Sequence, residues 1–161
     1  MSVLLDVRNL SLAYRTRQGL LPVLQEVSFS LAAGQTLGVV GESGSGKSQI
    51  ALALMGLLPV NAEVQGSIVF ESRELLTLKP RARRALRGAR MGLIFQDPMT
   101  SLNPHLTIGL QLAEVLEQHR GASRTAALAE SQRMLDAVRI PQAAQRLKQY
   151  PHELSGGQRQ R

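Results

Sequence analysis

The stretch Gly41–Ser48, "GESGSGKS", fits the pattern G-x-x-x-x-G-K-[ST], with Gly41, Gly46, Lys47 and Ser48 at the fixed positions. Glycines let several backbone N–H groups converge on an anion, and a following helix N-terminus adds unpaired N–H groups and a favourable dipole. The lysine can reach the terminal phosphates, and the serine hydroxyl can bind Mg²⁺. The stretch therefore predicts a nucleotide-phosphate site at the start of a helix.

The segments on either side supply the context that this motif needs. "TLGVV" (36–40) is a short continuous apolar run, which predicts a strand buried on both faces. "KSQIALALMGLL" (47–58) is rich in helix formers and ends just before Pro59. The order strand, glycine loop, helix supports a phosphate site, although the motif does not say which nucleotide is bound or what work is done.

Periodicity along the rest of the chain divides it into a strand-rich part and a helical part. Alternating or short apolar runs predict four more strands. These lie at 3–13, 27–31, 66–70 and 91–95. After a Pro- and Asn-containing loop, helical spacing predicts amphipathic helices at 108–115 and 128–138 and a short helix at 142–149. We therefore expect a phosphate-binding core over 1–100, a helical subdomain over 101–153 and a further helix beginning in 154–161.

The amino-acid composition limits the classes of protein and of binding site that this chain can represent. The 161 residues suit one domain with a real core, and the absence of cysteine excludes disulfides and zinc-thiolate sites. No apolar run reaches the roughly 18 residues of a membrane span, and 3% aromatic content argues against base stacking. The net charge is +7, and the segment 79–90 holds six cations and no acid. This run is either the solvated face of a short helix or a patch for an anionic partner.

A second glycine-rich motif carries a family resemblance. "LSGGQ" (Leu154–Gln158), about a hundred residues after the phosphate loop, resembles the signature motif of the ATP-binding-cassette (ABC) ATPases. Gln96 follows an apolar run where that family has its Q-loop glutamine, and Tyr14 fits the aromatic that stacks on adenine. The resemblance covers the whole chain. It implies an α/β P-loop NTPase fold with N-terminal antiparallel strands and a helical subdomain.

Longer stretches narrow the resemblance to one group of importers. "GESGSGKS", "IFQDPMTSLNP" and "YPHELSGGQRQR" are similar to ATPase subunits of the dipeptide, oligopeptide and nickel importers. The stretch "LEQHRGASRTAALAESQRMLDAVRI" (116–140) is similar to the microcin C and peptide transporter members. The resemblance implies ATP hydrolysis that energises the import of peptides or related solutes. It also implies a peripheral position on the cytoplasmic face of the inner membrane. The implied partners are permease subunits, a second ATPase domain (homodimer, heterodimer or tandem fusion) and, indirectly, a periplasmic solute-binding protein; no nucleic acid is expected.

The resemblance also implies roles for particular residues. Tyr14 would stack on the adenine, Lys47 and Gln96 would be catalytic, and Ser48 and Gln96 would bind Mg²⁺. The residues expected to hold the triphosphate are Gly41, Gly44, Ser45, Gly46, Lys47, Ser48 and Gln49. The signature residues expected to clamp ATP held by a second ATPase domain are Ser155, Gly156, Gly157 and Gln158. Structural alternatives stay open: Tyr14 as a strand-edge residue, Gln96 as an ordinary loop residue, and the signature as a simple helix cap.

Some groups of the family have no counterpart here. In the family, an apolar strand that ends in the Mg²⁺ aspartate and the catalytic glutamate follows the signature, and a switch histidine comes later. No run of four hydrophobic residues followed by Asp-Glu occurs in this sequence. We therefore expect a truncated piece whose own hydrolysis is crippled. The alternatives are a nucleotide-binding module without turnover and a soluble ABC protein that acts on nucleic acid, for which segment 79–90 is the sole support.

Overall fold

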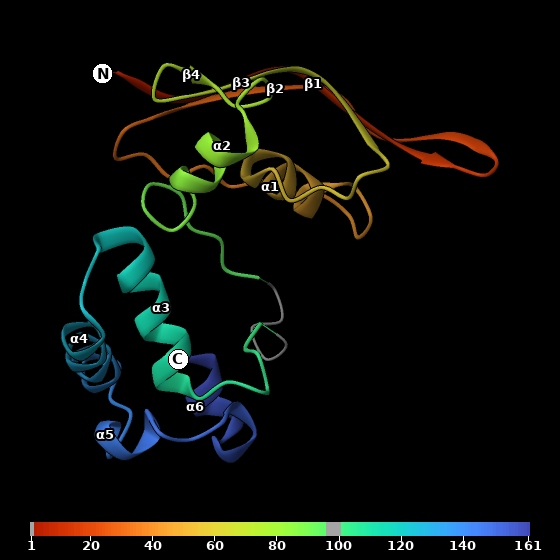
Figure 1. Ribbon diagram of the computed structural model, residues 1–161. Helices are drawn as coiled ribbons and strands as arrows, with labels where there is room; N and C mark the ends of the chain where they lie inside the picture. Colours follow the sequence, from red (N-terminus) through yellow and green to blue (C-terminus); the bar gives the residue numbers. More distant parts are fainter. Residues whose placement is uncertain (1, 96–100) are drawn as a thin grey trace. The chain divides into compact units, whose positions relative to one another are not determined.

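The computed structural model describes residues 2–95 and 101–161. It contains two compact units, Met1–Arg87 and Gly88–Arg161. The first unit is built on strands and carries the phosphate loop, and the second is helical and carries the signature motif (Figure 1).

The first unit is organised by a four-stranded antiparallel sheet in the order β2-β1-β3-β4. Its strands are β1 (Val3–Thr16), β2 (Gly19–Ala32), β3 (Ala62–Phe70) and β4 (Arg73–Glu74). The central strand β1 pairs with both β2 and β3, and its buried side chains include Leu5, Val7, Leu10 and Leu12. Alternate residues of a strand point to one face. An irregularity between Val7 and Leu10 shifts the register, so the odd-numbered and even-numbered halves of this apolar row are both buried. The strands predicted at 3–13, 27–31 and 66–70 are confirmed, and each is longer than predicted.

Two helices complete the first unit, and both lie on the same side of the sheet (Figure 1). They are α1 (Lys47–Met55), which buries Ala53 and Met55, and α2 (Pro80–Leu86), which buries Leu86. The guanidinium of Arg87 donates to the carbonyl oxygen of Gly56, the C-cap of α1, at 3.0 Å. Cations at a helix C-terminus complement its dipole and its unpaired carbonyls. Part of the basic run 79–90 therefore holds α1 in place.

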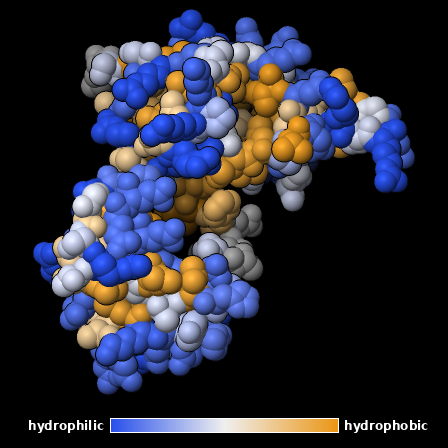
Figure 2. Space-filling model, in the orientation of Figure 1, coloured by the Kyte–Doolittle hydropathy of each residue, from blue (hydrophilic) through white to orange (hydrophobic). Residues whose placement is uncertain are grey.

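Three other cations of the basic run face outward. The side chains of Lys79, Arg81 and Arg84 are exposed, and they form no hydrogen bond or ion pair within the described part of the chain. Figure 2 shows hydrophilic side chains over α2 and apolar surface beside α1. This agrees with a short helix that has a solvated face, one of the two alternatives that the charge pattern left open.

The strand predictions for 36–40 and 91–95 are wrong. Residues 36–40 have no regular structure, and Val40 is 93% exposed. In the second segment Ile94 is 91% exposed, and Met91 alone has a single bridge. A strand needs a neighbouring strand for its N–H and C=O groups. Within the described residues neither segment pairs with one, so the apolar runs form no strand.

The second unit is a set of helices with clear end signals. They are α3 (Ile108–Arg120), α4 (Arg124–Ala137), α5 (Ala143–Arg146), the 3-10 turn η2 (Pro151–Glu153) and α6 (Gly156–Gln160). Thr107 and Ser123 cap α3 and α4 by accepting from backbone N–H groups three residues ahead, at 3.4 and 3.3 Å. The two amphipathic helices are confirmed, and the third predicted helix is shorter than predicted.

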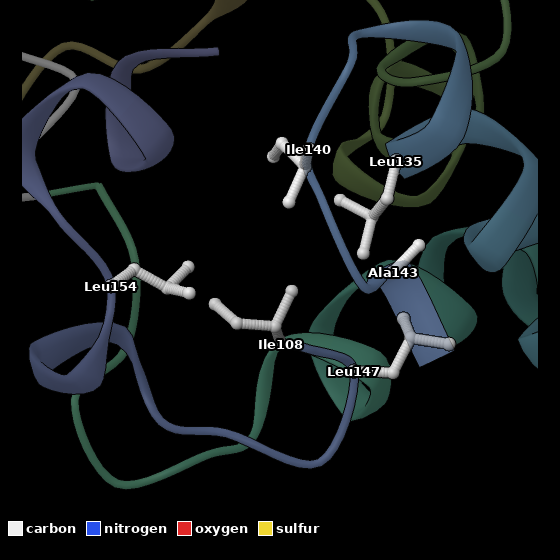
Figure 3. Packing of buried hydrophobic residues seen from close by; sticks show 6 residues of the cluster. All are labelled: Ile108, Leu135, Ile140, Ala143, Leu147 and Leu154. Carbon is white, nitrogen blue, oxygen red and sulfur yellow. The ribbon is translucent and has the colours of Figure 1, made fainter. Parts of the chain in front are cut away.

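The core of the second unit joins its helices to the segment before the signature. Figure 3 shows six buried side chains that point toward one another. They are Ile108, Leu135, Ile140, Ala143, Leu147 and Leu154. Close approach occurs at Gly109, where an added Cβ would lie 2.8 Å from the carbonyl oxygen of Leu147. Because Leu154 belongs to this cluster, the residue that opens "LSGGQ" is anchored in the core.

Candidate functional site

The phosphate loop depends on glycine at two positions for different reasons. Gly44 and Gly46 have φ values of +83° and +90°, a region that residues with a Cβ rarely adopt. Gly46 is also buried against β2, where an added Cβ would lie 2.6 Å from Leu24 Cδ2 and 3.2 Å from the carbonyl oxygen of Val23. The backbone of the first unit therefore requires the second fixed glycine of the motif, independently of any ligand.

Free N–H groups gather where the loop meets α1. The N-cap of this helix is Gly46, and no side chain caps it. Within the part of the chain that the structure describes, the backbone N–H groups of Gly44, Gly46, Lys47 and Ser48 donate no hydrogen bond. Unpaired N–H groups at a helix N-terminus, together with the helix dipole, attract anions. The residues present thus fit the triphosphate that the motif predicts.

The cation of the motif lies over the loop. The Nζ of Lys47 donates to the carbonyl oxygens of Gly41 and Glu42 at 2.8 and 2.6 Å, and to Ser45 Oγ at 3.3 Å. No carboxylate neutralises this ammonium in the described residues, so its positive charge remains to attract an anion. The side chain of Ser48 is exposed, and its hydroxyl makes no hydrogen bond there.

The structure also brings together two predicted site residues that lie far apart in the sequence. Tyr14 stands near the end of β1, opposite Leu21 of β2 and Ala62 of β3. Its hydroxyl donates to Oε1 of Gln49 in the first turn of α1 at 2.6 Å. This contact ties the end of the sheet to the helix that follows the phosphate loop. No spacing pattern in the sequence predicts this hydrogen bond.

The signature motif forms a reciprocal helix cap. Ser155 Oγ accepts from the N–H of Gln158 at 3.3 Å, and Gln158 Oε1 accepts from the N–H of Ser155 at 3.0 Å. Gly156 and Gly157 form the first turn of α6, and nothing lies within 4 Å of a Cβ added at Gly157. The motif is therefore a capped helix start with an open glycine surface, mounted on the core through Leu154.

Other predicted residues are not brought into this arrangement. Gln96 lies outside the described residues. The phosphate loop and the signature motif belong to different units, and each is described within its own unit. Among the described residues, no group of three His, Cys, Asp or Glu side chains could hold a metal ion. None of the described helices has the length and apolarity needed to cross a bilayer.

Some residues that the structure places against the loop and α1 give no signal in the sequence. Leu24 lies against Gly46, and Arg87 binds the far end of α1. At the β3–β4 edge of the sheet, Glu74 accepts from Ser67 Oγ at 2.5 Å and from the N–H groups of Leu76 and Ile68. Burial raises the pKa of this carboxyl, but these hydrogen bonds and the charge of Arg83 outweigh burial, so its pKa is lowered.

Comparison with known proteins gives a consistent result. A model of the ABC transporter family matches residues 24–161. The chain is 53% identical over 161 residues to the oligopeptide transport ATP-binding protein OppD of Haemophilus influenzae, which covers 100% of this chain and 50% of that protein. It is 47% identical over 163 residues to the dipeptide transport ATP-binding protein DppD of Bacillus subtilis, which covers 100% of this chain and 49% of that protein. The chain spans about half the length of these curated relatives.

A solved structure extends the likeness to the fold. The dimeric structure of MJ0796, a bacterial ABC transporter cassette, superposes with a TM-score of 0.79 and 23% sequence identity. The match covers 97% of this chain and 65% of that one. At this identity the likeness concerns the fold, and it agrees with the antiparallel strands and helices described above.

Proposed function

Because this chain belongs to the ABC transporter family, we propose that it binds ATP with Mg²⁺ at the phosphate loop. We further propose that the whole protein hydrolyses ATP to energise the import of peptides or related solutes through a membrane permease. The observation that carries the proposal is the loop itself, where four N–H groups without an acceptor and the Lys47 ammonium belong to one short segment. The names of the relatives, OppD and DppD, support peptides as the solute class.

Each motif has a role in this proposal. The loop residues hold the triphosphate, Ser48 and Gln96 bind the metal, and Tyr14 stacks on the adenine. Mg²⁺ would neutralise the β- and γ-phosphate charge, while the Lys47 ammonium binds and orients the terminal phosphates. The open turn at Ser155–Gln158 clamps the nucleotide of a second ATPase domain. For the domain organisation we propose the boundaries that hydrophobic periodicity predicts. These are a core over 1–100, a helical subdomain over 101–153 and the signature motif from 154.

The partners follow from the same proposal. A second ATPase domain supplies the other half of each nucleotide site, and the helical subdomain contacts permease subunits at the cytoplasmic face of the membrane. A solute-binding protein acts through the permease. The basic run gives a nucleic-acid function less support than its charge suggests, because Arg87 is engaged inside the first unit and Arg83 packs over Gly56.

Calorimetric titration with Mg-ATP tests the proposal. Removing the ammonium in Lys47→Ala deletes a charge-assisted contact to phosphate, which predicts about 10- to 100-fold weaker binding. Lys148→Ala is the matched control, since it removes the same charge from an exposed position in the second unit and should bind ATP as wild type does. Equal binding by Lys47→Ala and wild type would refute the phosphate site.

A phosphate-release assay on the same samples separates an ATPase from a module without turnover. ATP binding without release by this chain, with permease-stimulated release by the longer protein that contains it, is the expected pair of results. Release by the longer protein that is unchanged in Lys47→Ala would contradict the proposed role of the loop in hydrolysis.

A further inference from the structure

We propose that Gln49 is a positioning residue for the base site: its amide holds the Tyr14 ring in place, and it contributes to ATP affinity through the adenine rather than through the phosphates. This inference rests on the proposed function. It revises the expectation that the Gln49 side chain is one of the groups that hold the triphosphate. The juxtaposition that carries it is the hydrogen bond from Tyr14 to Gln49.

The backbone of Tyr14 is already fixed from two sides. Strand β1 is the central strand, and at this level it pairs with Leu21 on one side and Ala62 on the other. The backbone therefore has little freedom, and the orientation of the ring is decided by its two side-chain torsions. A phenol ring with two free torsions loses entropy when a base stacks on it, so restraint before binding favours affinity.

The hydrogen bond restrains those torsions. The O···O distance of 2.6 Å is within the range of good O–H···O bonds, and the contact is partly buried. Gln49 is itself fixed, because its backbone N–H donates to the carbonyl oxygen of Gly46 at 2.9 Å in the first turn of α1. The ring is thus tied to the helix whose N-terminus begins at the phosphate loop, which holds the base site and the phosphate site at a constant separation.

The direction of the bond decides which atom of Gln49 is engaged. An amide oxygen accepts and cannot donate, so the tyrosine hydroxyl is the donor and Oε1 of Gln49 is the acceptor. The side chain makes no other hydrogen bond in the residues that the structure describes. The amide oxygen of Gln49 therefore faces the phenol of Tyr14. In this position the side chain orients the ring and does not bind phosphate.

A double-mutant cycle with two ligands tests the inference. Tyr14→Phe removes the hydroxyl and keeps the ring, and Gln49→Met removes the acceptor at similar length in a residue that favours helix. Each single variant should bind Mg-ATP about three- to tenfold more weakly, the value of one net hydrogen bond. The double variant should lose no more than either single variant, because both remove the same contact. All three should bind Mg-tripolyphosphate, which has no base, as wild type does.

Three outcomes would overturn the inference. Loss of tripolyphosphate binding in Gln49→Met equal to its loss of ATP binding would make the glutamine a phosphate ligand. Losses that multiply in the double variant would make the two residues independent, and unchanged ATP binding in Tyr14→Phe would make the hydroxyl irrelevant. Tyr150→Phe, which removes the other tyrosine hydroxyl of the chain, is the control and should leave the affinity for both ligands unchanged.

A spectroscopic measurement keeps this test separate from the test of the proposed function. The chain has two tyrosines and no tryptophan, so Tyr14 is the sole source of near-ultraviolet tyrosine absorbance in a Tyr150→Phe background. Gln49→Met should shift that band toward the position of a tyrosine in water, without any nucleotide present. If wild type fails to bind ATP but the shift is seen, the proposed function fails and the contact stands. If ATP binds and no shift occurs, the positioning role fails alone.

Discussion

Replacing Gly46 by alanine should be the most damaging single-methyl change in the phosphate loop. The reason is structural and does not require a nucleotide. The residue has φ +90°, and its added Cβ would lie 2.6 Å from Leu24 Cδ2 and 3.2 Å from the carbonyl oxygen of Val23. The substitution therefore combines backbone strain with overpacking against β2.

Two control substitutions, at Gly38 and Gly44, give the expected loss in the free energy of unfolding. At Gly38, φ is not in the left-handed region and nothing lies within 4 Å of an added Cβ, so Gly38→Ala should change the free energy of unfolding by less than about 0.5 kcal/mol. At Gly44, φ is +83° but the space is open, so Gly44→Ala should cost about 1–2 kcal/mol from backbone strain. Gly46→Ala adds overpacking of about 1–3 kcal/mol, for a total of about 2–5 kcal/mol.

Urea unfolding followed by circular dichroism measures this series, with the three variants and wild type compared at one temperature and one pH. The expected order of stability is Gly38→Ala, then Gly44→Ala, then Gly46→Ala. If Gly46→Ala lost no more stability than Gly44→Ala, the contact with β2 would not constrain the loop. If Gly46→Ala matched Gly38→Ala, neither the backbone conformation nor the packing described here would hold.

Two further substitutions test the supports of each unit. Because the folded-state pKa of Glu74 lies below its ordinary value of 4.5, the ionised carboxylate stabilises the fold above that pH, and this stabilisation is lost as pH falls through the lowered pKa. Glu74→Gln should therefore be less stable than wild type at pH 7, and urea titrations should show the gap closing below pH 4.5; a constant gap would contradict the assignment. In the second unit, the Cβ of Gly109→Ala would lie 2.8 Å from the Leu147 carbonyl oxygen, so overpacking of about 1–3 kcal/mol should outweigh a helix-propensity gain of about 1 kcal/mol. A Gly109→Ala variant more stable than wild type in the same titration would show that α3 and α5 do not pack this closely.

Much of the fold could be predicted because its signals are local. The alternation of Leu5 and Val7 with Asp6 and Arg8 marks β1, and Thr107 and Ser123 mark the starts of two helices. These signals depend on residues that are adjacent or three to four apart, so a window of sequence contains them. The segments at 36–40 and 91–95 were mispredicted as strands because an apolar run measures the tendency to be buried and says nothing about the presence of a partner strand.

The candidate site also has features that the sequence predicts and features that only the tertiary structure shows. Glycine spacing, the lysine and the capping serine at 155 lie within short windows, and they sufficed to locate both glycine-rich motifs and to indicate the family that the comparison confirms. Only the tertiary structure could show that Gly46 rests on Leu24 and that the Tyr14 hydroxyl reaches Gln49, 35 residues away. Backbone conformation and helix capping are decided by near neighbours along the chain. Contacts between distant segments depend on strand register and helix placement, which exist only once the sheet has formed.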